Sequence, residues 1–187
     1  MINIFRSLGY SATGMAAIAW LSIILILTCI AGPDPDGDLT AYFADNIISE
    51  EDVDKSGYSF AELSENLFLL VANMNITLLI FTIFMTLSWV IGSHFLNIDA
   101  PGKAKIYAIH WLIFTGIYVV IVIGIISFFI SSTQFAAAQQ IGAAGGTLLY
   151  FLETIYYTLI YYVGVLLGTA RFARSSVLFA NKLPGNL

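Results

Sequence analysis

The chain has 187 residues, of which 59% are hydrophobic and 10% are charged, and its formal net charge is −5. Soluble domains carry about 25% charged residues, so this composition excludes a soluble globular fold and predicts an all-α integral membrane protein. The single cysteine, Cys29, excludes an intramolecular disulfide bond.

Four long apolar stretches predict four transmembrane helices in a single domain. Each stretch exceeds the roughly 20 residues that an α-helix needs to cross the hydrocarbon layer. The first is too long for the ~7–15-residue apolar region of a signal peptide, so we interpret it as a retained first crossing. The predicted helices cover 10–31, 59–96, 106–130 and 147–169 of a domain spanning 1–187, with an outer loop over 32–58.

The charges around these stretches are sorted by sign. Ten of the twelve acidic residues lie between the first and second apolar stretches, and only Lys55 is basic there. The positive-inside rule therefore predicts cytoplasmic termini, an acidic extracytoplasmic loop and a bacterial cytoplasmic (inner) membrane location. The other six basic residues fall in three segments on the predicted cytoplasmic side: Arg6, Lys103, Lys105, Arg171, Arg174 and Lys182.

The second predicted helix is the longest. Ser59 and Glu62 form a capping-box pattern that predicts its start before the apolar run begins. At 1.5 Å per residue it would reach about 57 Å, nearly twice the thickness of the hydrocarbon layer.

Polar residues form two neighbouring rows along this helix. We interpret the rows as interhelical hydrogen-bonding positions, with a hydrated path or ligand groove as the sharper alternative. One row contains Asn66, Asn73, Thr77 and Ser88, and the other contains Asn75, Thr82, Thr86 and Ser93.

Small residues at helical spacing predict where helices pack closely, since lipid tails leave no hydrophobic force between helices. Such surfaces can face the chain's own bundle or another subunit. The positions are Gly164 and Gly168, Gly142 and Gly146, Gly9, Thr13 and Ala17 with Ala12 and Ala16 alongside, and Gly116 and Gly124; Asn73 and Asn75 are predicted to join the packing.

Glu153 is the one carboxylate inside an apolar run, and it shares a helical face with Tyr150, Tyr157 and Tyr161. Intramembrane acids are costly and commonly functional. One hypothesis is therefore a proton or cation site with tyrosine hydroxyls as partners. The alternative is a neutral, hydrogen-bonded acid that fixes helix packing.

His94 and His110 lie on either side of the predicted turn between the second and third helices. Facing each other, they could hold a haem iron or a metal ion. We favour the simpler interpretation that both are interfacial side chains.

The outer loop contains the run Asp52-Val53-Asp54-Lys55-Ser56-Gly57, with an acid at Glu62. This run resembles the start of an EF-hand calcium loop, and the resemblance implies Ca²⁺ ligation by Asp52, Asp54, Ser56 and Glu62. The acid comes eleventh rather than twelfth, and Glu62 already has a role in the helix cap.

The sequence contains no nucleophile–base set, phosphate loop or zinc motif, which argues against an enzyme, and no cofactor is firmly implied. We expect a non-enzymatic subunit that assembles or stabilises a larger membrane complex. Its expected partners are the lipid bilayer and other membrane-protein subunits, not nucleic acid. The alternatives are a small transporter or proton- or cation-conducting subunit using Glu153, and a haem-binding redox subunit using His94 and His110.

Overall fold

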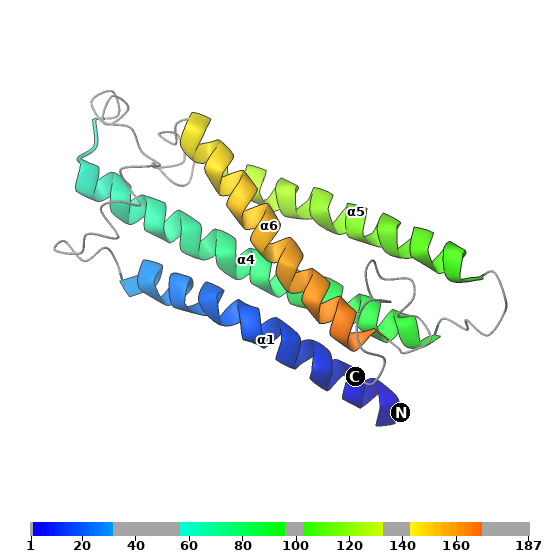
Figure 1. Cartoon of the computed structure of the whole chain (residues 1–187). Helices are drawn as coiled ribbons and strands as arrows, with labels where there is room; N and C mark the ends of the chain where they lie inside the picture. The colour runs from blue at the N-terminus through cyan, green and yellow to red at the C-terminus, as the bar shows by residue number, and fades with distance from the viewer. Residues whose placement is uncertain (1, 32–56, 96–102, 133–142, 170–187) are drawn as a thin grey trace. The chain divides into compact units, whose positions relative to one another are not determined.

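The computed structural model describes residues 2–31, 57–95, 103–132 and 143–169, and all regular structure within these ranges is helical (Figure 1). Within the described residues, all four helices are long and apolar enough to cross a membrane, as the sequence predicts. The helices are α1 (Ile2–Ala31), α4 (Phe60–Phe95), α5 (Lys103–Ile130) and α6 (Ala143–Gly168).

The largest difference from the predicted boundaries is at the first helix, which begins at Ile2 rather than Tyr10. Hydropathy marks the part of a helix that faces hydrocarbon, whereas the backbone hydrogen-bond ladder continues through polar residues such as Arg6 and Ser7. The ends of the other three helices lie a few residues from the predicted ones, as is usual for helix termini.

The predicted capping box at the start of α4 is confirmed. The Ser59 backbone N–H donates to Glu62 Oε2 at 2.9 Å, and the Glu62 N–H donates to Ser59 Oγ at 3.3 Å. Gly57 precedes this cap with φ = 74°, a left-handed conformation that favours glycine. The reciprocal bonds satisfy two of the amide groups that an uncapped helix start would leave without partners.

The chain divides into two compact units, and each helix contributes one part to each unit. Unit 1 takes its described residues from Met1–Trp20, Ile80–Ile121 and Tyr156–Leu187, and unit 2 from Leu21–Leu79 and Val122–Ile155. The core of unit 1 is aromatic, with Tyr118, Tyr157 and Tyr161 fully buried. The core of unit 2 is mainly aliphatic, with Leu67, Met74 and Ile126 among its fully buried side chains.

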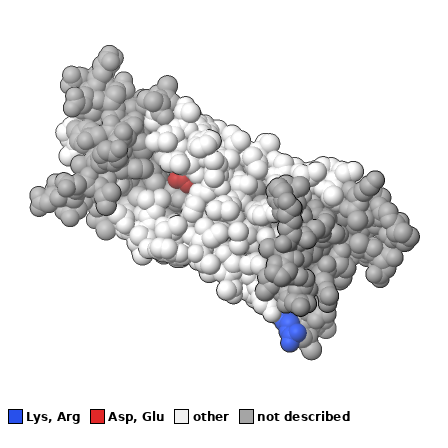
Figure 2. Space-filling view, viewed as in Figure 1, with Lys and Arg blue, Asp and Glu red and all other residues white. Residues whose placement is uncertain are grey.

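Large apolar side chains also cover the outside of the helices. On α5, Leu112, Ile113 and Val120 are each more than half exposed. Figure 2 shows a described surface that is white except for one blue and one small red area. Such an apolar exterior would aggregate in water, but it is the normal surface of a helix facing lipid tails.

Candidate functional site

Glu153, on α6, is buried in unit 2 and bonds to α4. The Asn75 Nδ2–H group donates to Glu153 Oε1 at 3.0 Å, and the same amide nitrogen donates to the Val71 carbonyl at 3.0 Å. Asn75 is fully buried and Glu153 is 7% exposed. The predicted intramembrane acid is therefore tied to the predicted polar row of the second helix by a direct interhelical hydrogen bond.

In unit 2, α1 and α5 also contribute polar side chains to the region around Glu153. The Cys29 thiol of α1 is buried and lies within electrostatic reach of the Glu153 carboxyl. Tyr150, one turn before Glu153 on α6, donates its hydroxyl to Ser127 Oγ of α5 at 2.9 Å. Unit 2 thus contains polar contacts from α6 to both α4 and α5.

Tyr157 and Tyr161, the other two tyrosines predicted to share the face of Glu153, belong to a network in unit 1. The Tyr118 hydroxyl donates to the Tyr157 carbonyl at 2.9 Å and lies 2.9 Å from Thr82 Oγ1. Because the Tyr118 proton is already used, the Thr82 hydroxyl must donate to Tyr118. Tyr161 stacks on Tyr118 with ring centroids 4.3 Å apart, and its hydroxyl lies 3.3 Å from Thr115 Oγ1.

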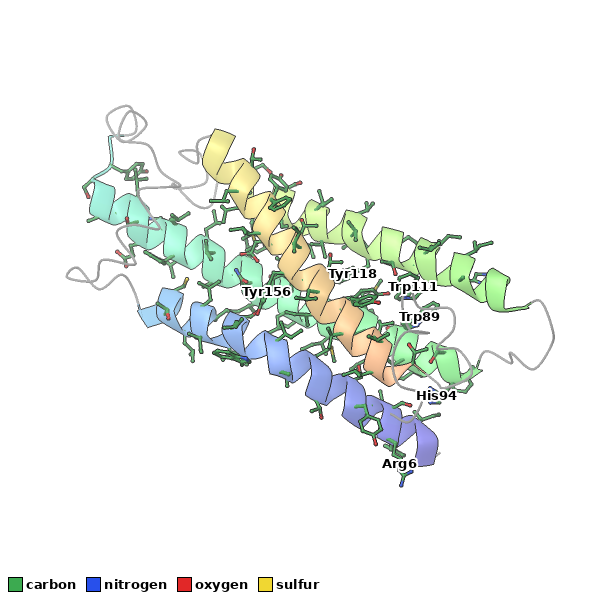
Figure 3. The ribbon with its side chains drawn as sticks, viewed as in Figure 1. Arg6, Trp89, His94, Trp111, Tyr118 and Tyr156 are labelled. Carbon is green, nitrogen blue, oxygen red and sulfur yellow. The ribbon has the colours of Figure 1, made fainter. Side chains whose placement is uncertain are left out.

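Sequence reasoning missed Tyr118, the residue at the centre of this network (Figure 3). Its ring also stacks on Phe81 of α4, with centroids 5.8 Å apart. The usable signal was a single tyrosine in an otherwise aliphatic part of α5, since a buried tyrosine hydroxyl normally finds a partner.

The glycines Gly164 and Gly168 of α6 lie at close helix contacts in unit 1. A Cβ atom added at Gly168 would lie 2.6 Å from Ser11 Cβ and 2.6 Å from Val90 Cγ2. One added at Gly164 would meet the side chains of Met15 and Thr86 at 2.6 and 2.7 Å. α6 therefore approaches α1 and α4 so closely that a side chain does not fit at either position.

The second pair of predicted packing glycines is only partly described. Gly146 is buried in unit 2, whereas Gly142 lies outside the described residues. Gly116 and Gly124 of α5 are exposed and have no atom within 4 Å of an added Cβ. The α5 glycines therefore make no close contact with the described part of this chain.

On the first helix, the predicted small-residue surface faces outward. Gly9, Thr13 and Ala17 are exposed, as are Ala12 and Ala16. The inward side is instead marked by a run of buried residues spaced three or four apart, which is the periodicity of one helical face. These residues are Ser11, Met15 and Ala19 in unit 1, and Ser22, Ile26 and Cys29 in unit 2.

The two polar rows of α4 have different environments. Asn73 and Thr77 in unit 2 are exposed, and each donates to the carbonyl four residues earlier in its own helix, at 2.7 and 2.8 Å. By contrast Asn75 is buried in unit 2, and Thr82, Thr86 and Ser93 are buried in unit 1. The row of Asn75 therefore lies inside the protein. In the other row Asn73 and Thr77 face outward, while Asn66 and Ser88 are half-buried.

The histidines of unit 1 also differ in their environments. His94 Nε2 lies 3.2 Å from Ser7 Oγ of α1, and its Nδ1 lies 2.9 Å from the Val90 carbonyl. Since a carbonyl only accepts, Nδ1 carries a proton, and in the neutral ring Nε2 accepts from the Ser7 hydroxyl. His110 is exposed on α5. Both nitrogens of His94 thus have protein partners, and this geometry does not favour ligation of a haem iron.

The calcium-loop hypothesis falls mostly on residues that the structure does not describe. Asp52, Asp54 and Ser56 lie outside the described residues, while Glu62 is exposed at the start of α4. Glu62 Oε2 accepts from both the backbone N–H and the hydroxyl of Ser59, at 2.9 and 2.8 Å. This carboxylate therefore has a structural role in the helix cap.

Comparisons with protein-family models, with curated proteins and with solved structures find no match. The class of the protein follows from its own helices. Four helices of sufficient length and apolarity make this chain a multi-pass membrane protein.

Proposed function

We propose that this protein is a non-enzymatic, four-span subunit that assembles with other membrane-protein chains. The observation that carries the proposal is Asn73, an amide side chain exposed within the long span of α4. Its N–H group donates to the Leu69 carbonyl, which leaves the amide oxygen available as an acceptor. A polar group facing hydrocarbon is costly, and a hydrogen bond from a neighbouring helix removes that cost.

The open glycines of α5 support the same proposal. Gly116 and Gly124 are exposed within a membrane span, and nothing lies within 4 Å of an added Cβ at either position. Small residues at such positions allow a second helix to approach closely. α5 also has the smallest buried share of the four spans, so most of its surface is available to lipid or to another subunit.

Photo-crosslinking in native membranes tests this function. A photoreactive residue at position 73 should form a crosslink to another membrane protein, and one at the exposed Leu152 of α6 should react mainly with lipid. Asn73→Leu should then reduce co-purification with the crosslinked chain in mild detergent. A monodisperse monomer, with crosslinks to lipid alone at position 73, contradicts the proposal.

The proposed topology places both termini in the cytoplasm, in a bacterial inner membrane. The arrangement of Lys and Arg residues supports it through the positive-inside rule. In a Cys29→Ser background, a cysteine at Ser59 should react with a membrane-impermeant thiol reagent added outside, whereas one at Arg6 should react only after permeabilisation. The reverse labelling pattern would overturn this orientation.

The bond between Asn75 and Glu153 favours a second candidate function, a small transporter or a proton- or cation-conducting subunit. An intramembrane acid held on two helices is a common element of ion pathways. Glu153→Gln should abolish ion flux in the assembled complex or in proteoliposomes, and unchanged flux rejects conduction through this residue.

A further inference from the structure

We infer that Glu153 is a proton-binding site within the membrane, which holds a neutral carboxylic acid and releases its proton reversibly. The inference deepens the second candidate function, but its test does not depend on conduction. Glu153 on α6 accepts a 3.0 Å hydrogen bond from Asn75 on α4, and its side chain is 7% exposed.

The orientation of the Asn75 amide follows from its two partners. The Val71 carbonyl only accepts hydrogen bonds, so the atom 3.0 Å from it must be the amide nitrogen rather than the amide oxygen. The same nitrogen faces Glu153 Oε1, which therefore accepts. Oε1 is therefore the acceptor oxygen of the carboxyl, and a proton on Glu153 resides on Oε2.

A single neutral donor does not compensate a full negative charge in a low-dielectric medium. The helix segments of unit 2, which are Leu21–Ala31, Phe60–Leu79, Val122–Ile130 and Ala143–Ile155, contain no Lys, Arg or His in their sequence. Binding a proton therefore removes the free-energy cost of keeping an uncompensated negative charge in the carboxyl. The geometry thus favours the neutral acid in the resting protein.

The same orientation argues for a proton rather than a metal ion. Hard cations need several oxygen ligands, and a cation on Glu153 Oε1 would face the positive N–H edge of Asn75.

From α1, the Cys29 thiol is the titratable group near the carboxyl. The segment of α5 in unit 2 has no titratable side chain, the α6 segment adds Tyr150, and the α4 segment adds Glu62 and Glu65, which are exposed.

A hydrophobic carbodiimide, dicyclohexylcarbodiimide, tests for this acid in native membranes. The carboxyl proton moves to a carbodiimide nitrogen while the carboxyl oxygen bonds the central carbon, and the adduct rearranges to a stable N-acylurea without loss of any group. Since only the protonated acid reacts, mass spectrometry should find the adduct on Glu153 at neutral pH. Labelling should decrease as the pH is raised and recover when the pH is lowered again.

Three variants and a competition experiment with metal cations test whether the labelling reports a proton on Glu153. Glu153→Gln should abolish the adduct, whereas Asn75→Leu should retain it, because the loss of the donor to Oε1 leaves the neutral acid favoured over the carboxylate. Glu65→Gln, at an exposed acid, should leave the labelling unchanged. Excess Na⁺, K⁺ or Ca²⁺ at constant pH should give no protection, and protection by one of these ions would overturn the assignment to a proton.

Infrared spectroscopy of the wild-type chain supplies a measurement that does not rely on folding of a variant. A carboxylic acid C=O band that decreases at alkaline pH and returns at neutral pH is the expected result. Absence of both the adduct and this band at neutral pH, or labelling that does not vary with pH, overturns the proposal. Reversible labelling without ion flux in the wild type rejects conduction but leaves the proton site in place.

Discussion

Units 1 and 2 contain parts of the same four helices, and α6 contacts α4 in a different way in each unit. In unit 1, α6 contacts α1 and α4 at Gly164 and Gly168, where no side chain fits. In unit 2, α6 is joined to α4 by the side-chain bond between Glu153 and Asn75. Because lipid tails solvate apolar side chains as well as a neighbouring helix does, close packing and hydrogen bonding are the two available means of association.

The two units also differ in the number of buried polar atoms that lack a hydrogen-bond partner. Among the described residues, five buried side-chain atoms have no hydrogen-bond partner, and all five lie in unit 1. They belong to Ser11, Thr86, Trp89, Trp111 and Thr158. Such groups cost free energy, so we infer that packing at the glycines outweighs their cost in unit 1.

The largest expected effect is at Gly168, where α6 lies close to both α1 and α4. Gly168→Leu places a side chain against Ser11 Cβ and Val90 Cγ2, which lie close to their own backbones and cannot swing away. We expect a loss of about 3 kcal/mol in the free energy of unfolding, the upper part of the range for overpacked cores. Unfolding by SDS in mixed detergent micelles measures this loss.

The control for Gly168→Leu is Gly116→Leu on α5, which has open space around its added Cβ. It makes the same chemical change and should leave the stability of the isolated protein within about 0.5 kcal/mol. Equal losses for the two variants would show that the effect comes from glycine replacement in general and not from helix contact.

The next effect tests the polar contact of unit 2. Asn75→Leu removes the one amide donor of Glu153 and should cost about 1–2 kcal/mol, near the upper end for interhelical hydrogen bonds in membranes. Asn73→Leu, two residues away on the same helix, removes only a bond to its own backbone. In the isolated protein it should be close to neutral, and a loss as large as that of Asn75→Leu would contradict the division between inward and outward rows.

How far the sequence predicts this structure depends on the kind of feature. The four spans follow from hydropathy, and the cap of α4 follows from Ser59 and Glu62, because both are local properties of the chain. Which face of a helix turns inward depends on neighbours. On α1 the small residues Gly9 and Ala17 face outward, and the inward face at Ser11 and Met15 follows only from a longer three–four periodicity.

The candidate site shows the same limit. Glu153 stands out in the sequence because a carboxylate in an apolar run is costly wherever it points. Its partner does not stand out, since Asn73 and Asn75 have the same chemistry and lie two residues apart. Only the packing of α6 against α4 in unit 2 selects Asn75.

A third prediction compares two threonines of the inward row in unit 1. Thr82 and Thr86 are one turn apart and fully buried, but the Thr82 hydroxyl donates to Tyr118 while that of Thr86 has no partner. Thr86→Val removes an unsatisfied hydroxyl at constant shape and should raise the free energy of unfolding by about 1 kcal/mol. Thr82→Val breaks a bond and should lower it by about 0.6 kcal/mol. Changes of the same sign would show that the two hydroxyls share one environment.

The smallest effect is expected for Glu153→Gln, and its size separates two roles of the acid. If Glu153 is neutral, the glutamine keeps both the shape and the acceptor oxygen that faces Asn75, so the stability should change by less than about 0.5 kcal/mol. If the carboxyl is ionised and its charge holds α4 and α6 together, the neutral amide should weaken the contact by about 1 kcal/mol or more, as expected for a hydrogen bond to a charged group. Combining Glu153→Gln with Asn75→Leu in a double-mutant cycle measures this term directly, since a coupling energy that survives the glutamine substitution belongs to a neutral hydrogen bond. A near-neutral Glu153→Gln beside a costly Asn75→Leu would show that the fold of unit 2 needs an acceptor at position 153 and does not need a charge there.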